Sequence, residues 1–396
     1  MSAGNIAYGK DYFPRPNDER KIWRKIAQGD NLLLLAPRRV GKSSLLHHLK
    51  NNPIEGYGLI YNYAQTSTSE VEFYQNLLKD ITESDFVKTS AKLSAKFQSW
   101  FNKLKLNFSF EAKGAKVESG IKETNVSSSV ENEIIRKVLL DGLSETETIL
   151  IIAIDEFPDA LINIHKIHGE TAAIQFLSGI RSLCQNAELN KKVRFIFTGS
   201  IGLDTVVKKL QLSNLINDLV HTTIEPLSDM KAREFIDFYF EQDSNGVIDD
   251  SLKNIIIEQV GWNMPYYLAL VCEEILDNYD DIQLITASNV LDCVDQLFTH
   301  EAKTNFSHWR ERLKRLDKEE RDYAQALLTL VCDNDEPLSY SEIVNLSQNI
   351  KYKDNVNTNY VLDCLKHEGY LFHNRADNTY WFTSPFLKRW WHLYGR

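Results

Sequence analysis

A glycine–lysine–serine cluster near the N-terminus has the residue types and spacing of a phosphate-binding loop. Residues 36–43 read A-P-R-R-V-G-K-S, which departs from G-x-x-x-x-G-K-[ST] only where Ala36 replaces the first glycine. In such a loop Gly41 lets the backbone approach the phosphates, Lys42 reaches the β- and γ-phosphates, and Ser43 offers its hydroxyl to Mg²⁺. We therefore predict that ATP binds at the loop residues, which are Pro37, Arg38, Arg39, Val40, Gly41, Lys42, Ser43 and Ser44.

The segments on either side of this loop are those that a phosphate site requires. An apolar run at 32–35 predicts a buried strand before the loop, and residues 45–49 predict a helix after it. The N–H groups at the start of such a helix, together with the positive end of its dipole, favour bound phosphate. The alternative is a strand–turn–helix junction that contains Gly-Lys-Ser by chance and binds nothing.

An acidic pair follows the most apolar segment of the chain. Residues 149–154 are all apolar, which is typical of a strand buried on both faces of a parallel sheet. Asp155 and Glu156 then fall at the C-terminal end of that strand, where open α/β sheets bind their ligands. There Asp155 would hold Mg²⁺ through water, and Glu156 would activate the attacking water as a general base. The alternative is an acidic turn after a core strand.

Another strand is predicted at 192–197, and the polar residues Thr198-Gly199-Ser200 follow it. A hydroxyl at this strand end is able to touch the γ-phosphate or the attacking water. Ser200 is our first candidate for this role and Thr198 our second. A plain turn after the strand is the alternative.

The remaining core elements follow from apolar periodicity and turn signals. Helices are predicted at 18–28, 70–80, 130–143 and 170–186, and strands at 59–63 and 222–227. Together they predict an α/β core with a parallel sheet over residues 1–227. The arm before the first helix contains Phe13 and Arg15, and it either packs on the core or covers a nucleotide base.

Residues 82–130 differ in composition from the rest of the core. They are rich in lysine and serine and also hold Phe97, Trp100 and Phe101. We predict an insertion made of a helix and a hairpin, with strands at 106–110 and 117–121. Basic and aromatic side chains together bind single strands or phosphates in some proteins, and they form a solvated face in others.

The C-terminal half reads as two further domains. Helical periodicity over 228–312, broken at 261–268, predicts a helical lid. The segment 313–396 predicts a winged helix, because three helices precede a hairpin and a closing helix. The predicted helices are at 322–331, 340–346, 357–367 and 384–391, and the hairpin strands at 369–373 and 379–382.

Composition narrows the class of protein. The chain has 396 residues, of which 43% are hydrophobic and 25% charged, and this is ordinary for a globular protein of two or three domains. A net charge of -10 argues against general coating of nucleic acid. The five cysteines are scattered, which predicts reduced thiols and neither a disulfide framework nor a zinc site. With no apolar signal core and no long apolar stretch, we expect a soluble cytoplasmic protein.

These motifs resemble the archaeal-type P-loop ATPases of the STAND group, which are relatives of AAA+ proteins and of archaeal replication initiators. The resemblance covers nearly the whole chain except 82–130 and implies an ASCE/AAA+-like P-loop core, a helical lid and a C-terminal winged helix. It also implies that Phe13 and Arg15 lie near the base and that Pro265 contacts the nucleotide from the lid. Alanine is frequent in this family at the position of Ala36. The motifs are the loop with paired arginines, Asp155-Glu156-Phe157-Pro158, Phe197-Thr198-Gly199-Ser200, the segment 261–267, and the terminal Ser384-Pro385-Phe386 with Trp390-Trp391.

An arginine that ring-forming relatives place after the Ser200 position is missing. Residues 203–225 contain Lys208 and Lys209 but no arginine. Because an arginine finger contributes roughly 10³–10⁵ in rate, we expect slow hydrolysis of ATP to ADP and phosphate. Arg38, Arg39 and Arg181 are the candidates to replace it.

Three functions fit these features. The first is an ATP-hydrolysing switch whose nucleotide state controls a protein partner or effector, with a role in defence against mobile elements by analogy only. The second is an ATP-dependent DNA-binding protein of initiator or transposition-regulator type, although the 357–367 helix carries few base-reading side chains. The third is a nucleotide-binding scaffold without turnover, against which Glu156 argues. Self-association stays open in all three.

Overall fold

The chain folds into two compact units. The computed structural model describes residues 3–111, 130–199, 203–243, 246–299, 304–314, 316–350 and 356–395. The sheet unit comprises Arg15–Ala36 and Leu45–Thr223. The helical unit comprises Met1–Pro14, Pro37–Ser44 and Ile224–Arg396.

A five-stranded sheet forms the centre of the sheet unit. The strands run in the order β2-β3-β4-β1-β5, and every pairing is parallel. The carboxyl ends of all the strands therefore lie at one edge, and β4 separates β1 from β3. Their bounds are β1 (Leu32–Leu35), β2 (Tyr57–Tyr63), β3 (Ile149–Asp155), β4 (Val193–Thr198) and β5 (Val220–Thr223). The predicted α/β core with a parallel sheet is confirmed.

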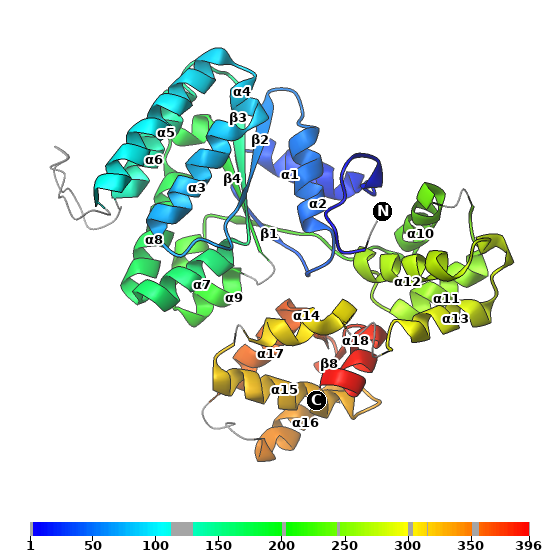
Figure 1. Ribbon diagram of the computed structural model, residues 1–396. Coiled ribbons are helices and arrows are strands. Elements are labelled where there is room, and N and C mark those ends of the chain that lie inside the picture. Colours follow the sequence, from blue (N-terminus) through cyan, green and yellow to red (C-terminus); the bar gives the residue numbers. More distant parts are fainter. Residues whose placement is uncertain are drawn as a thin grey trace. The chain divides into compact units, whose positions relative to one another are not determined.

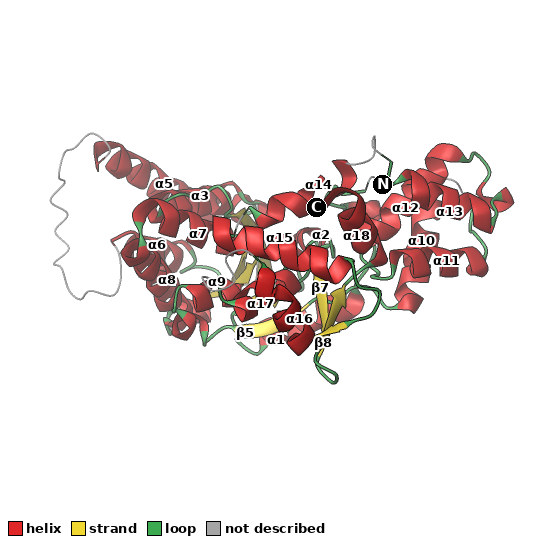
Figure 2. Cartoon of the chain, turned by 90° about the horizontal axis from the view of Figure 1, so that it is seen from below, coloured by secondary structure: helices red, strands yellow, loops and turns green. Residues whose placement is uncertain are grey.

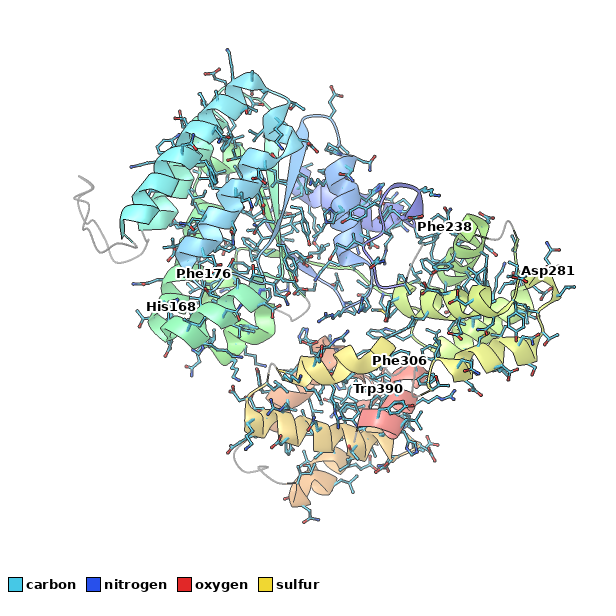
Figure 3. All side chains as sticks on the ribbon, viewed as in Figure 1. His168, Phe176, Phe238, Asp281, Phe306 and Trp390 are labelled. Atoms are coloured by element: carbon cyan, nitrogen blue, oxygen red, sulfur yellow. The ribbon has the colours of Figure 1, made fainter. Side chains whose placement is uncertain are left out.

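Helices cover both faces of this sheet (Figure 1). One side holds α1 (Pro16–Ala27) and α2 (Lys42–Asn51), and the other side holds α3, α5, α6, α7 and α8. On the second side Phe157 packs 5.6 Å from Phe176 and 4.9 Å from Phe197, measured between ring centroids. Phe176 is labelled in Figure 3. The remaining elements are α3 (Glu70–Glu83), α4 (Asp85–Lys88), α5 (Ala91–Glu111), α6 (Val130–Gly142), α7 (Phe157–His168), α8 (Glu170–Gln185), η2 (Leu189–Lys191), α9 (Leu203–Lys209) and η3 (Ser213–Ile216).

A buried asparagine ties the start of β1 to three other elements. Asn31 is 7% exposed, and its side-chain Oδ1 accepts from the Phe195 N–H at 2.8 Å. Its Nδ2 donates to the Cys184 carbonyl at 3.1 Å, and its own carbonyl accepts from the Val220 N–H at 2.8 Å. One residue therefore satisfies buried polar groups on β4, α8 and β5.

The helical unit contains the N-terminal arm, a series of helices and a small antiparallel sheet that α18 and η8 follow. This sheet has the order β6-β8-β7, and Figure 2 shows its β7–β8 hairpin next to α16 and α17. The first helices are α10 (Asp229–Asp243), α11 (Asp250–Val260), α12 (Pro265–Asn278) and α13 (Ala287–Gln296), with η1 (Gly9–Asp11) in the arm and η4 (Ile282–Leu284) before α13. The later elements are α14 (Thr304–Leu313), α15 (Lys318–Cys332), β6 (Leu338–Ser339), α16 (Tyr340–Leu346), η6 (Ser347–Asn349), α17 (Thr358–His367), β7 (Leu371–Asn374), β8 (Thr379–Phe382), α18 (Pro385–Trp390) and η8 (Trp391–Gly395).

The turn between α11 and α12 is fastened to the C-terminal segment. Ser384 donates its hydroxyl to the Val260 carbonyl at 2.8 Å. Gly261 has φ +63°, and a Cβ there would lie 2.3 Å from Pro385, so only glycine fits this turn. Phe298 and Phe386 pack edge to face at 5.2 Å nearby. Phe306, which Figure 3 labels, packs against both of these rings. Helices α11 and α12 and the C-terminal elements are thus packed together within one unit.

Two of the predicted strands differ from the structure. Residues 106–110 are helical as part of α5, because the apolar residues of 93–108 also recur at helical spacing. The last core strand is Val220–Thr223, earlier than the predicted 222–227. The helix α7 was not predicted, although Pro158 in its first turn is a helix-start signal. The predicted strand at 117–121 lies outside the described residues.

Two expectations from the composition concern disulfide bonds and membrane-crossing helices. All five cysteines are buried and form no disulfide bond, as the sequence predicted. A membrane-crossing helix is absent from the described ranges, because none combines the required length with the required hydropathy.

Replacing Asn31 tests the fold directly. Asn31→Ala leaves a buried N–H of β4 without its partner and removes one of the two side-chain donors of the Cys184 carbonyl, so we expect the free energy of unfolding to fall by about 1–3 kcal/mol. Urea unfolding followed by circular dichroism measures this loss. The exposed Asn51, at the end of α2, is the control, and Asn51→Ala should change stability by less than about 0.5 kcal/mol. Equal losses in the two variants would contradict the role given to Asn31.

Candidate functional site

The glycine–lysine–serine loop has the backbone of an anion cradle. Helix α2 begins at Lys42, so the N–H groups of its first turn point toward the loop. Gly41 has φ +91° and Arg39 φ +72°, and alternation of this kind turns successive N–H groups to one side. For a non-glycine residue such as Arg39 the left-handed conformation costs about 1–2 kcal/mol. Strain of this size in a loop points to a functional constraint.

The loop also leaves room for a ligand. A Cβ added to Gly41 would meet no atom within 4 Å, so open space lies in front of this residue. Val40 is fully buried at 0% exposure and anchors the loop, and Lys42 is 8% exposed. An anchored loop with open space at its glycine is the arrangement that a phosphate group requires.

Arg39 joins the loop to the start of α12. Its guanidinium lies 4.3 Å from the ring centroid of Tyr266, and its Nη1 donates to the Gly4 carbonyl at 3.3 Å. Burial lowers the pKa of Arg39, whereas Tyr266 raises it. Pro265 stands in the first turn of α12, directly before Tyr266. The sequence did not predict this cation–π contact.

The N-terminal arm rests on the same elements. The Ala7 N–H donates to the Ser44 hydroxyl at 3.0 Å, and the Ala3 N–H donates to the Glu273 carboxylate at 3.3 Å. Phe13 packs edge-on against Phe235 at 5.3 Å, and also against Phe238, which Figure 3 labels. The ring of Phe13 therefore packs against α10.

Arg15 lies in the sheet unit, at the start of α1. Its Nε forms an ion pair with the Asp18 carboxylate at 2.8 Å, and its side chain is 9% exposed. Its backbone N–H donates to Glu19 at 3.2 Å. These bonds are local to the first turn of α1. Such local bonds are consistent with Arg15 packing on the core.

The acidic pair lies at the carboxyl end of β3. Asp155 is the last residue of the strand and is 1% exposed. Its Oδ2 accepts from the Tyr61 hydroxyl at 2.8 Å and its Oδ1 from the Glu156 N–H at 3.0 Å. Glu156 is half-buried and has φ +55°, directly before α7. The two carboxylates thus differ, since one is buried and held and the other is partly open to solvent.

The two hydroxyl candidates at the end of β4 differ in what the structure describes. Thr198 is fully buried, and its Oγ1 donates to the Leu34 carbonyl at 3.0 Å. That bond ties β4 to β1 and uses the only proton of the hydroxyl. Ser200 lies outside the described residues.

Arg181 is engaged within the sheet unit. Its Nη1 donates to the Asn214 carbonyl, and its Nε lies 3.8 Å from the Asp218 carboxylate. Both partners belong to the segment between α9 and β5. This segment holds the guanidinium against α8.

His47 and Tyr61 were not predicted as part of a site. His47 is on α2, and its ring centroid lies 4.3 Å from that of Tyr61 on β2. Burial lowers the pKa of His47, the Lys50 charge lowers it further, and Asp155 raises it. The sequence predicts that Tyr61 is in a strand, but not that this strand lies beside β3.

Comparison with known proteins supports the fold. No protein-family model and no curated protein matches the chain. A Walker-type ATPase of Pyrococcus abyssi is similar in structure with a TM-score of 0.62, at 18% identity over 97% of both chains. The ORC2 protein of Aeropyrum pernix, solved as ADPNP–ADP complexes, gives 0.51 at 11% identity over 95% of this chain and 90% of that one. At such identities the likeness shows the fold alone, and it confirms the predicted P-loop ATPase fold.

The shifted histidine gives a pH test of this region. The pKa of His47 in the folded chain lies below the ordinary 6.5. As the pH falls, His47 is therefore protonated in the unfolded chain at a higher pH than in the folded chain, and this difference destabilises the folded chain. We expect the unfolding free energy of the wild type to fall more steeply than that of His47→Phe between about pH 7.5 and about pH 5.5.

The exposed His168, labelled in Figure 3, is the control. His168→Phe should keep the pH dependence of the wild type, measured by chemical unfolding at each pH. Parallel curves for the wild type and His47→Phe would contradict the shift.

Proposed function

We propose that the chain binds ATP with Mg²⁺ and hydrolyses it slowly, as a switch. The observation that carries this proposal is the position of β4 between the parallel strands β1 and β3. The strand that leads into the loop and the strand that ends in Asp155 therefore open at one edge of the sheet, a single strand apart. Ligands of open α/β sheets bind at this edge.

Phosphate binding is assigned to the loop and to the first turn of α2. The backbone N–H groups from Arg38 to Ser44 would surround the β-phosphate, and Lys42 would reach the β- and γ-phosphates. The left-handed Arg39 and Gly41 and the open space at Gly41 support this assignment. Phe13 and Arg15 are less favoured as base contacts, because packing and local bonds engage them. For Pro265, its place beside Tyr266 supports a nucleotide contact.

Metal binding is assigned to the Ser43 hydroxyl and, through water, to Asp155. When bound, Mg²⁺ neutralises charge that develops on the transferred phosphoryl group. No cluster of three or more metal-ligating side chains occurs in the described part of the chain. Mg²⁺ needs no such cluster, since it takes one or two carboxylates together with phosphate oxygens and water. The buried, doubly hydrogen-bonded Asp155 fits that donor set.

Water activation is assigned to Glu156. Its carboxylate would accept a proton from water as the water oxygen attacks the γ-phosphorus and the bond to the bridging oxygen of ADP breaks. The half-buried side chain and the left-handed backbone at φ +55° support this role. With Thr198 bonded to Leu34, Ser200 remains our candidate for a γ-phosphate contact.

The positions of the arginines favour a slow nucleotide-dependent switch over a motor. Residues 203–225 hold no arginine, and Arg181 is held by Asn214 and Asp218. Arg39 is stacked on Tyr266 of α12, which gives the loop a direct contact with the lid. A γ-phosphate that attracts Arg39 would change that contact, and such a differential interaction is what a nucleotide-dependent switch requires.

A protein partner is favoured over DNA by the C-terminal elements, which we interpret as a winged helix. On the β7–β8 hairpin Phe372 is 46% exposed and faces Trp381 across the strands at 4.7 Å. On α17 Lys366 is paired with Asp363 at 2.8 Å. An exposed Phe372 backed by the half-buried Trp381 suits protein docking, whereas base reading needs free polar or basic side chains. A role in defence against mobile elements rests on the family resemblance alone.

The loop lysine provides the first test. Lys42→Ala removes the charge that faces the phosphates, so the dissociation constant for ATP should rise at least about tenfold. Isothermal titration calorimetry measures it. Lys50→Ala, at the other end of the same helix, is the control and should bind as the wild type does. Unchanged binding in Lys42→Ala would remove the loop from the site.

The proposed base provides the second test. Glu156→Gln keeps the shape of the side chain but cannot accept the proton, so phosphate release should fall about 10²–10⁴-fold while ATP binding persists. Glu170→Gln, an exposed glutamate at the start of α8, is the control and should leave the rate unchanged. Equal rates in Glu156→Gln and the wild type would show that Glu156 is not the base.

A further inference from the structure

We infer that Tyr61 is a positioning residue that sets the orientation of the Asp155 carboxylate and thereby the affinity for Mg²⁺; this rests on the proposed function. In the β2–β3 register Tyr61 stands opposite Ala153, and Tyr63 stands opposite Asp155. The phenol of Tyr61 therefore reaches forward along the sheet to the strand end. Its hydroxyl donates to Oδ2 of Asp155 at 2.8 Å.

The hydrogen bonds of Asp155 hold its carboxylate in one plane. One oxygen accepts from the Tyr61 hydroxyl and the other from the Glu156 N–H at 3.0 Å. At 1% exposure an ionised carboxylate needs such donors. Two donors on different oxygens restrict rotation of the group. Partners of this kind change metal affinity by about 10–100-fold when removed.

Tyr61 is itself held in place from α2. The ring of His47 packs against the ring of Tyr61 with centroids 4.3 Å apart and planes inclined by 36°. The same helix begins at Lys42. The phenol thus lies between the phosphate-binding helix and the carboxylate proposed to hold the metal. It couples the position of one to that of the other.

The neighbouring tyrosine on this face serves a different purpose. Tyr63 is two residues further along β2, so its side chain projects from the same face of the sheet. It is 45% exposed, and its hydroxyl donates to the side chain of Gln65. The donor to Asp155 is therefore Tyr61, even though Tyr63 is the residue in register with Asp155. Tyr63 offers a matched control, because Tyr63→Phe removes a hydroxyl from the same strand.

The test compares Tyr61→Phe with Tyr63→Phe in the full chain. Electron paramagnetic resonance of Mn²⁺ measures the affinity of the ADP complex for the metal, and calorimetry measures ADP binding without metal. We expect Tyr61→Phe to weaken Mn²⁺ binding about tenfold and to leave metal-free ADP binding unchanged. Tyr63→Phe should match the wild type in both measurements.

A second readout separates positioning from a structural role. Saturating Mg²⁺ should restore the maximal rate of phosphate release in Tyr61→Phe, whereas a distorted site would keep a lower maximal rate. Mn²⁺ affinity within about twofold of the wild type in Tyr61→Phe would overturn the inference and leave the proposed function standing. Absence of Mn²⁺ binding by the wild-type ADP complex would overturn both.

Discussion

All five strands of the sheet run in one direction, so one edge receives every carboxyl end. Strand β1 is held at both ends of its length. Asn31 bonds to β4, α8 and β5 where the strand begins, and Thr198 bonds to the Leu34 carbonyl near its end. A strand held in this way gives the loop that follows it a defined starting point. The rest of the proposed site depends on that placement.

The sequence predicted the parts of the site that are contiguous in the chain. Apolar runs predicted the positions of β1 and β3, and residue type and spacing alone identified Gly41, Lys42 and Asp155 as candidate site residues. The sequence did not predict contacts that depend on which elements lie side by side in the fold. The bond from Tyr61 to Asp155 requires β2 to lie beside β3, and the stacking of Arg39 on Tyr266 joins residues far apart in the chain. Residues 106–110 were mispredicted because five residues fit a period of two as well as one of 3.6.

The switch that we propose uses strain and packing already present in the helical unit. Arg39 is in a left-handed conformation and stacks on Tyr266 in the first turn of α12. The turn before α12 is fastened to the C-terminal segment through Gly261 and Ser384. A change at Tyr266 would therefore pass into elements that are packed together, including those of the β7–β8 hairpin. Packed elements of this kind shift between discrete arrangements more readily than they deform.

The central claim is that nucleotide occupies the loop and that its γ-phosphate alters the contact with α12. Amide hydrogen exchange of the full chain with no nucleotide, with Mg²⁺–ADP and with a non-hydrolysable Mg²⁺–ATP analogue tests it most directly. The account predicts that both nucleotides slow exchange across the loop Pro37–Ser44. It also predicts that the two nucleotides give different exchange rates in the first turn of α12. Identical exchange of the loop with and without nucleotide would contradict the account.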